Sequence, residues 1–186
     1  MTTTTTSDLP VLRLDCAGWR AWLSDNHATC KGCLLVIDRG GAPDALAYLD
    51  AVEEALCFGW IDSTIWPQEG HTLQRFTPRR KGSNWTELNI ARCERLERMG
   101  LMMDAGRAVI PDRPFSIDDD VAAAIRSDPE VSANFDSLPP LYVRIRVANI
   151  QCKRGTRLFD VRLKRFLDDT RKGVLRGNWD DRGRLP

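Results

Sequence analysis

The chain has 186 residues, 42% of them hydrophobic and 28% charged, a composition typical of a soluble globular protein with one sizeable core. No apolar run approaches the roughly 18–20 residues that a membrane-spanning helix needs, so we expect no membrane span. The start of the chain lacks the basic and apolar regions of a secretory signal, which predicts a cytoplasmic location. In that compartment the six cysteines stay as thiols.

The net charge of +1 is unevenly distributed along the chain. Residues 144–186 hold 13 Lys and Arg against five Asp and Glu, so this end carries +8 and the remainder −7. Such a segment favours an anionic partner, although a solvated basic helix has the same pattern. Its arginines do not alternate with aromatic residues as a platform for single strands requires, so we do not expect nucleic acid as a partner.

Helices and strands alternate in the first part of the chain. Four elements are predicted before Gly59: a strand at 11–14, a helix at 16–26 capped by Asp15, a buried strand at 33–37 and a helix that opens at Pro43 and Asp44.

Two further strands, 60–66 and 71–77, are predicted to form a hairpin around a four-residue loop, Pro67–Gly70. In the simplest register Asp62 lies opposite Arg75. The same register places Trp60 opposite Thr77, with Trp60, Asp62 and Trp66 on one face.

The rest of the chain is predicted to be helical. Ser83 is a candidate cap for a helix over about 84–99, and a short helix follows from Asp104. The acidic, proline-containing stretch at 112–117 is predicted to be a linker. Four helices are predicted after it, at 119–126, 129–136, 141–151 and 156–172.

Six stretches carry a family resemblance: 19–23 (WRAWL), 26–29 (NHAT), 53–62 (EEALCFGWID), 73–80 (LQRFTPRR), 83–89 (SNWTELN) and 105–106 (AG). Over about residues 9–172 the chain resembles the YdeI/OmpD-associated family, also called bacteriocin-protection proteins. The resemblance implies an α+β fold with a small antiparallel sheet, as in YjbR/CyaY-like proteins, and a role in envelope stress. It implies no particular reaction. The block at 152–157 is one residue shorter than the family's.

These patterns predict the domain organisation. Residues 1–8 are a disordered leader and residues 9–111 an α+β body. The linker at 112–117 leads to a helical segment of the OmpD-associated type at 118–172, and residues 173–186 are a flexible tail.

The stretch from Glu53 to Asn89 combines three of the six tryptophans with three consecutive cations at 79–81. This mixture suits a pocket with aromatic walls that binds a small anionic or aromatic molecule. Arginine forks at a helix start suit a carboxylate or phosphate. The predicted ligand-binding residues are Trp60, Arg75, Arg79, Arg80, Ser83, Trp85 and Asn89. The alternatives are core packing for the tryptophans and an exposed basic turn for the cations, which we favour for Lys81.

Asp62 is the candidate acid or base. Burial beside Trp60 would raise its pKa into a useful range, whereas an ion pair with Arg75 would lower it and hold the hairpin. Cys30 and Cys33 form a single CxxC pair, which supplies too few ligands for a zinc site. Because motifs for nucleophiles, phosphate loops and dinucleotides are absent, we expect neither a metal nor a cofactor.

The leading hypothesis is a cytoplasmic, stress-linked binding protein of the YdeI type. The first alternative is a cofactor-free isomerase, cyclase or hydrolase that uses Asp62 as its acid or base. The second is an adaptor that binds a protein partner through its basic C-terminal helices.

Overall fold

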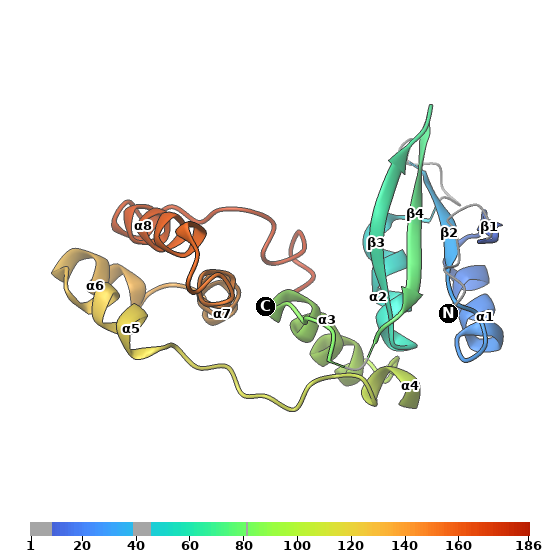
Figure 1. Cartoon of the computed structure of the whole chain (residues 1–186), viewed down its shortest axis with the longest axis horizontal. Helices are drawn as coiled ribbons and strands as arrows, with labels where there is room; N and C mark the ends of the chain where they lie inside the picture. Colours follow the sequence, from blue (N-terminus) through green and yellow to red (C-terminus); the bar gives the residue numbers. More distant parts are fainter. Residues whose placement is uncertain (1–8, 39–45, 81) are drawn as a thin grey trace. The chain divides into compact units, whose positions relative to one another are not determined.

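A computed structural model describes residues 9–38, 46–80 and 82–186, and within them it has a four-stranded sheet and eight helices (Figure 1). The predicted α+β fold is confirmed. The chain divides into two compact units. The N-terminal unit comprises residues 1–84 and 92–111, and the C-terminal unit comprises residues 85–91 and 112–186. The predicted leader, residues 1–8, lies outside the described residues, as do Pro43, Asp44 and Lys81.

The sheet belongs to the N-terminal unit and has the strand order β1-β2-β4-β3. Its strands are β1 (Val11–Leu12), β2 (Cys33–Asp38), β3 (Trp60–Pro67) and β4 (His71–Pro78). The three longer strands are antiparallel, as predicted. The sheet as a whole is mixed, because β1 runs parallel to β2 at the edge.

The predicted hairpin exists, but its predicted register is wrong. Asp62 lies opposite Phe76, not Arg75, and Trp60 lies opposite Pro78. A β-bulge between Asp62 and Ile65 then inserts one extra residue into β3, so Trp66 lies opposite Leu73. Gln74 donates from Nε2 to the carbonyl oxygen of Ser63 in the bulge, at 3.2 Å.

The bulge also changes which side chains share a face of the sheet. A strand alternates faces at every residue, and an extra residue reverses the alternation beyond it. Trp60 and Asp62 therefore share a face with Phe76, whereas Trp66 lies on the other face with Leu73.

Helices α1 (Cys16–Asn26) and α2 (Tyr48–Cys57) pack against each other. Asp15 caps α1 as predicted, and its Oδ1 accepts from the amide of Gly18 at 2.7 Å. The short helix α4 (Asp104–Arg107) packs on α2. A Cβ at position 106 would clash with the backbone of Cys57, so glycine is needed where these two helices meet.

Helix α3 (Glu87–Arg98) begins three residues later than predicted. Its first amide groups are capped by Thr86, whose Oγ1 accepts from the backbone nitrogen of Asn89 at 3.2 Å. Ser83 is therefore not the cap, because it lies one turn too early. Residues 85–91 belong to the C-terminal unit, and residues 92–98 belong to the N-terminal unit.

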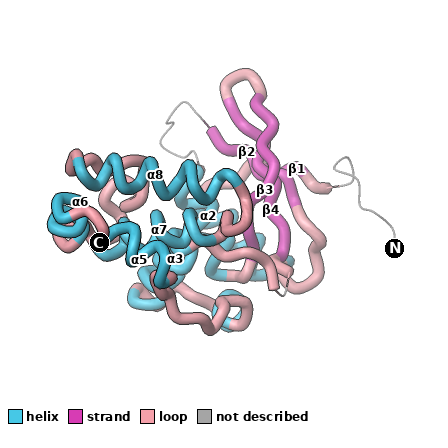
Figure 2. The backbone as a smooth tube through the Cα atoms, turned by 60° about the vertical axis from the view of Figure 1, so that its left-hand side comes forward, coloured by secondary structure: helices cyan, strands magenta, loops and turns pink. Residues whose placement is uncertain are grey.

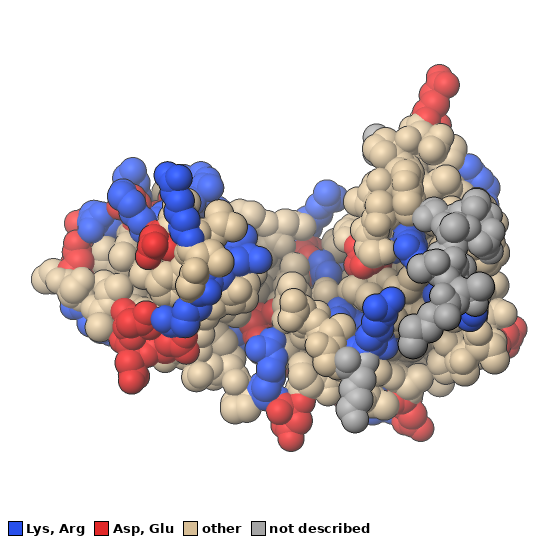
Figure 3. Space-filling model, viewed as in Figure 1, with Lys and Arg blue, Asp and Glu red and all other residues tan. Residues whose placement is uncertain are grey.

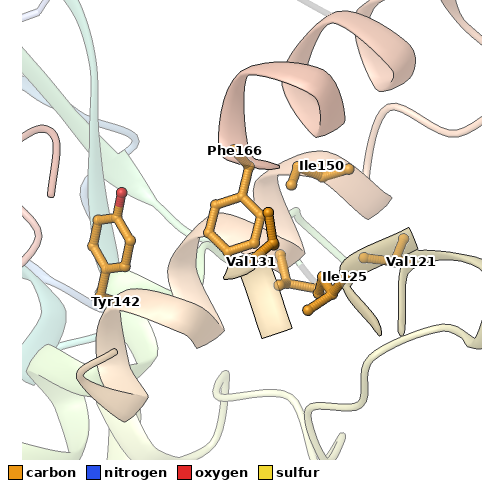
Figure 4. Close-up of a cluster of buried hydrophobic side chains, with 7 residues drawn as sticks. Val121, Ile125, Val131, Tyr142, Ile150 and Phe166 are labelled. Atoms are coloured by element: carbon orange, nitrogen blue, oxygen red, sulfur yellow. The ribbon is translucent and has the colours of Figure 1, made fainter. Parts of the chain in front are cut away.

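The C-terminal unit contains helices but no strand in its described part (Figure 2). These are α5 (Asp119–Arg126), α6 (Pro129–Phe135), α7 (Pro140–Gln151) and α8 (Arg157–Arg171). Helix α8 packs against both α6 and α7. They enclose a separate hydrophobic core of Val121, Ile125, Val131, Tyr142, Val147, Ile150 and Phe166 (Figure 4).

The segment 173–186 differs from the predicted flexible tail, because part of it packs onto this core. Trp179 meets the ring of Tyr142 edge-on, with 5.8 Å between the ring centroids. Asp181 and Leu185 are buried. These contacts come from turns, not from a helix, so no periodic pattern announces them. None of the described helices is long and apolar enough to cross a membrane.

Candidate functional site

Trp60 is a core residue of the N-terminal unit. Its side chain is 1% exposed, and it meets Trp19 and Trp22 edge-on at centroid distances of 6.5 and 5.7 Å. Its indole nitrogen donates to the carbonyl oxygen of His27 at 3.1 Å. Phe76 completes this aromatic cluster from β4, at 5.4 Å from Trp19. The ring of Trp60 therefore stabilises the fold and is not accessible as a pocket wall.

Asp62 and Arg75 lie on opposite faces of the sheet, so they do not form the predicted ion pair. Asp62 is half-buried, and its Oδ2 accepts from the hydroxyl of Tyr48 on α2 at 2.8 Å. Arg75 is half-buried opposite Leu34 of β2.

Arg79 is buried in the turn that follows β4. Its Nη1 donates to the carbonyl oxygen of Asn84 at 3.2 Å and to Oγ of Ser83 at 3.5 Å. Burial lowers the pKa of the guanidinium, and Cys93 and the Asp62 carboxylate act in the opposite direction. Arg79 thus closes the turn, whereas the neighbouring Arg80 is exposed.

Trp85 and Asn89 belong to the C-terminal unit. Trp85 is buried, and its carbonyl oxygen accepts from Nη2 of Arg113 at 3.0 Å. Asn89 is half-buried in the first turn of α3. Within the N-terminal unit, the predicted ligand-binding residues are thus distributed over an aromatic core, two faces of a sheet and a turn, whereas Trp85 and Asn89 belong to the C-terminal unit.

A cavity of about 790 Å³ lies between α7 and α8 in the C-terminal unit, within the size range of small-molecule sites. We call it the arginine cavity. It is lined by Tyr142, Arg146, Asn149 and Ile150 of α7, by Arg162, Arg165, Phe166 and Asp169 of α8, and by Val174, Leu175, Arg176 and Gly177 after α8.

Helical spacing explains how these residues converge. The α7 residues have the spacing i, i+4, i+7, i+8 and the α8 residues the spacing i, i+3, i+4, i+7, so each set forms one stripe along its helix. Between them, Tyr142, Ile150 and Phe166 also belong to the hydrophobic core and form the apolar side of the cavity. The α7 stripe spans about 12 Å of helix.

The charged lining consists of four arginines and one carboxylate, a net charge of +3. Figure 3 shows Lys and Arg side chains gathered over the region of α8. The single carboxylate, Asp169, is mostly buried and accepts from Nε of Arg176 at 2.6 Å. This hydrogen bond raises the pKa of Arg176. The more exposed Arg165 places its Nε 3.9 Å from the same oxygen.

The other two cavity arginines are held by neutral groups. Nη1 of Arg162 donates to the carbonyl oxygen of Asn149 at 2.6 Å. The guanidinium of Arg146 lies 5.2 Å from the ring centroid of Tyr142 and donates to the carbonyl oxygen of Arg176. Among the residues that the structure describes, no carboxylate forms an ion pair with Arg146 or Arg162. Both positive charges are therefore fixed in place and not neutralised by an ion pair.

Comparison with known families gives one match. Residues 13–109, more than half of the chain, match the model of a family described as "Domain of unknown function (DUF8412)". The chain belongs to this family. Neither the curated proteins nor the solved structures contain a match to the chain.

The region matched by the DUF8412 family covers β2–β4 and α1–α4 and ends before the arginine cavity. The resemblance to YdeI/OmpD-associated proteins stays a prediction. In the described part of the chain, no group of three His, Cys, Asp or Glu residues is arranged to hold a metal ion.

Two features of the sequence point to the cavity, but the residue patterns alone do not show that they belong to one site. The basic excess of residues 144–186 indicated an anionic partner. The two helical stripes of arginines and rings, at 142–150 and 162–169, are also visible in the sequence. What joins them is the packing of α7 on α8.

Proposed function

We propose that this DUF8412 protein is a binding protein for a small anionic ligand, which it holds in the arginine cavity. One observation carries the proposal: four arginines and one carboxylate line a cavity of suitable size. A guanidinium matches the geometry of a carboxylate or phosphate with two parallel hydrogen bonds.

The four arginines divide into two pairs with different roles. Arg146 and Arg162 are the principal ligand contacts, because neutral partners position them without neutralising their charge. Asp169 accepts a hydrogen bond from Arg176 and orients its guanidinium in advance, and the exposed Arg165 lies near the same carboxylate. Side chains that are ordered before binding lose less conformational entropy when the ligand arrives.

The apolar side of the cavity selects among anions. Tyr142 and Phe166 present rings, and Ile150 presents an aliphatic chain, next to the arginines. A ligand with an anionic group and an apolar part therefore gains from both kinds of contact. This agrees in ligand class with the small anionic or aromatic molecule that the sequence predicts, but the binding residues are different.

The wider biological role is part of the proposal and comes from the resemblance to YdeI/OmpD-associated proteins. We propose a cytoplasmic protein linked to envelope stress. The acid–base enzyme and the protein adaptor remain alternatives. The hydrogen bond that Asp62 accepts from Tyr48 occupies its carboxylate and does not favour catalysis.

The proposal is tested by calorimetric titration of the full chain with phenyl phosphate. We expect binding that weakens about tenfold or more in Arg162→Gln, because a hydrogen bond to a charged group contributes roughly 1.5–3 kcal/mol. Arg157→Gln is the matched control. It removes the same charge from the exposed start of α8, outside the cavity, and should change the dissociation constant by less than about twofold.

Two results would contradict the proposal. One is the absence of heat or thermal stabilisation with phenyl phosphate, inorganic phosphate and benzoate alike. The other is an equal loss of affinity in Arg162→Gln and Arg157→Gln, which would indicate a diffuse effect of net charge. Circular dichroism of each variant establishes that the helices are retained.

A further inference from the structure

Exposed apolar side chains lie on the segments that form the arginine cavity. Within the described part of the C-terminal unit, four large hydrophobic residues are markedly exposed: Leu158 (50%), Val161 (51%), Val174 (38%) and Leu175 (44%). We call these four residues the apolar border. A cluster of this kind on a soluble domain marks a binding surface more often than chance exposure does.

Two members of the apolar border line the cavity, and the other two share a helix face with its arginines. Val174 and Leu175 line it directly. Leu158 lies one helical turn before Arg162, and Val161 lies one turn before Arg165, so each shares a face of α8 with a cavity arginine. Exposed aliphatic groups and charged guanidiniums thus share a face of α8.

We infer that the ligand is an anionic amphiphile, a molecule with one carboxylate or phosphate head and a single apolar chain. This inference rests on the proposed function and specifies the ligand class of the same site. The head occupies the positive field of Arg146 and Arg162, and the chain covers part of the apolar border. Chain burial removes apolar surface of both partners from water.

The charge pattern distinguishes this ligand from a purely apolar one. A neutral hydrocarbon would leave the guanidiniums of Arg146 and Arg162 without an anion while covering their water-exposed groups, which is costly. A small polar anion would leave the apolar border in contact with water. Only a ligand with both parts satisfies both features of the site.

The test is a homologous series of ethyl, butyl, hexyl and octyl phosphate, titrated calorimetrically into the full chain below the concentration at which each forms micelles. We expect affinity to rise about two- to fourfold for each methylene that becomes buried. Octanol, which has the chain without the charge, should bind more weakly than octyl phosphate by at least about tenfold.

Two double variants show where the alkyl group of the ligand binds. They are Val174→Ser/Leu175→Ser and Leu158→Ser/Val161→Ser. In at least one of them the dependence of affinity on the length of the alkyl group should disappear. Ile65→Ser is the matched control, because it removes an equally exposed aliphatic side chain from the N-terminal unit.

The outcomes separate the inference from the proposed function. If all four alkyl phosphates bind equally well and Arg162→Gln weakens the binding of each, the proposed anion site is supported and the inference of an amphiphilic ligand is wrong. If neither double variant changes the chain-length dependence, the apolar border is not the binding surface and the inference is also wrong. If the protein binds vesicles of anionic phospholipid but not monomeric octyl phosphate, the inference is wrong and the site binds a membrane surface.

Discussion

Two regions of this protein combine aromatic rings with arginines, and they differ in how accessible the arginines are. In the stretch from Trp60 to Trp85, the rings of Trp60, Phe76 and Trp85 are buried and Arg79 is bound by the turn that it closes. Around the arginine cavity, aliphatic side chains are exposed and the arginines line open space. A dense mixture of rings and charge in a sequence therefore does not by itself indicate a pocket.

The physical difference lies in the partners of the arginines. Arg79 is desolvated, and its charge is held by backbone oxygen and by nearby groups of its own unit. Arg146 and Arg162 also contact backbone oxygens, but they do so at the wall of a cavity of about 790 Å³. Access to the charge, not its presence, separates a structural arginine from a candidate ligand contact.

The largest expected effect is on the aromatic core. Trp60→Ala should lower the free energy of unfolding by about 3–5 kcal/mol, because it removes a fully buried ring and leaves a cavity. Urea unfolding followed by circular dichroism measures this loss. Trp66→Ala, which removes a half-buried ring from the other face of the sheet, should cost clearly less. Equal losses would show that Trp60 is not the centre of this core.

The next effect concerns a buried carboxylate of the C-terminal unit. Glu87 is buried and accepts from Arg144 at 2.7 Å and from Arg113 at 3.2 Å. Glu87→Gln should lower the free energy of unfolding by about 2–3 kcal/mol, since two charge-assisted hydrogen bonds are weakened. Glu97→Gln, which disrupts an exposed ion pair with Arg107, should cost less than about 1 kcal/mol. A larger loss of stability in Glu97→Gln than in Glu87→Gln would contradict the structural role given to Glu87.

A smaller effect on stability is expected at acidic pH. Asp128 caps α6 and accepts from Arg171 of α8, and that hydrogen bond, followed by the one from the amide of Val131, lowers the pKa of the carboxyl. Its contribution to stability is therefore present above the ordinary aspartate pKa of about 3.9 and is lost as pH falls through the lower folded value.

Asp128→Asn tests this contribution. Unfolding measured from about pH 6 to pH 2 should depend less steeply on pH in the variant than in the wild type below about pH 4. An identical pH dependence in both proteins would mean that Asp128 does not titrate differently in the folded and unfolded states.

The smallest expected effect is at Asp62. Asp62→Asn weakens one exposed hydrogen bond from Tyr48, so the free energy of unfolding should fall by less than about 1 kcal/mol. The affinity for phenyl phosphate should not change. If the variant folds and loses that affinity, the binding site belongs to the hairpin, and the comparison between the two regions fails.

Local signals were sufficient to predict much of the fold. The Asp15 cap and the helical pattern after it predicted α1 at its observed bounds, and the turn residues around Gly70 predicted the β3–β4 hairpin. The predicted register of β3 and β4 was wrong because a β-bulge at Ser63, which Gln74 stabilises from the neighbouring strand, was not visible in the sequence. The start of α3 was predicted too early because Ser83 was the predicted cap, whereas Thr86, which has the same kind of side chain, caps the helix three residues later.

The candidate site was harder to predict than the fold. The residue types at 53–89 predicted a small anionic or aromatic ligand, and the basic excess at 144–186 favoured an anionic partner. The location depends on α7 packing against α8 and on the return of residues 174–177 over them. Such long-range contacts leave no periodic signal in the chain.

The most direct test of the central claim is a map of ligand binding on backbone amide resonances. Phenyl phosphate is titrated into ¹⁵N-labelled full-length protein while the amide shifts are followed. We predict the largest shift changes in residues 142–150, 162–169 and 174–177, with little change around Trp60, Asp62 and Arg79. Changes concentrated in residues 60–83, with the α7 and α8 resonances unmoved, would contradict the account and return the site to the hairpin.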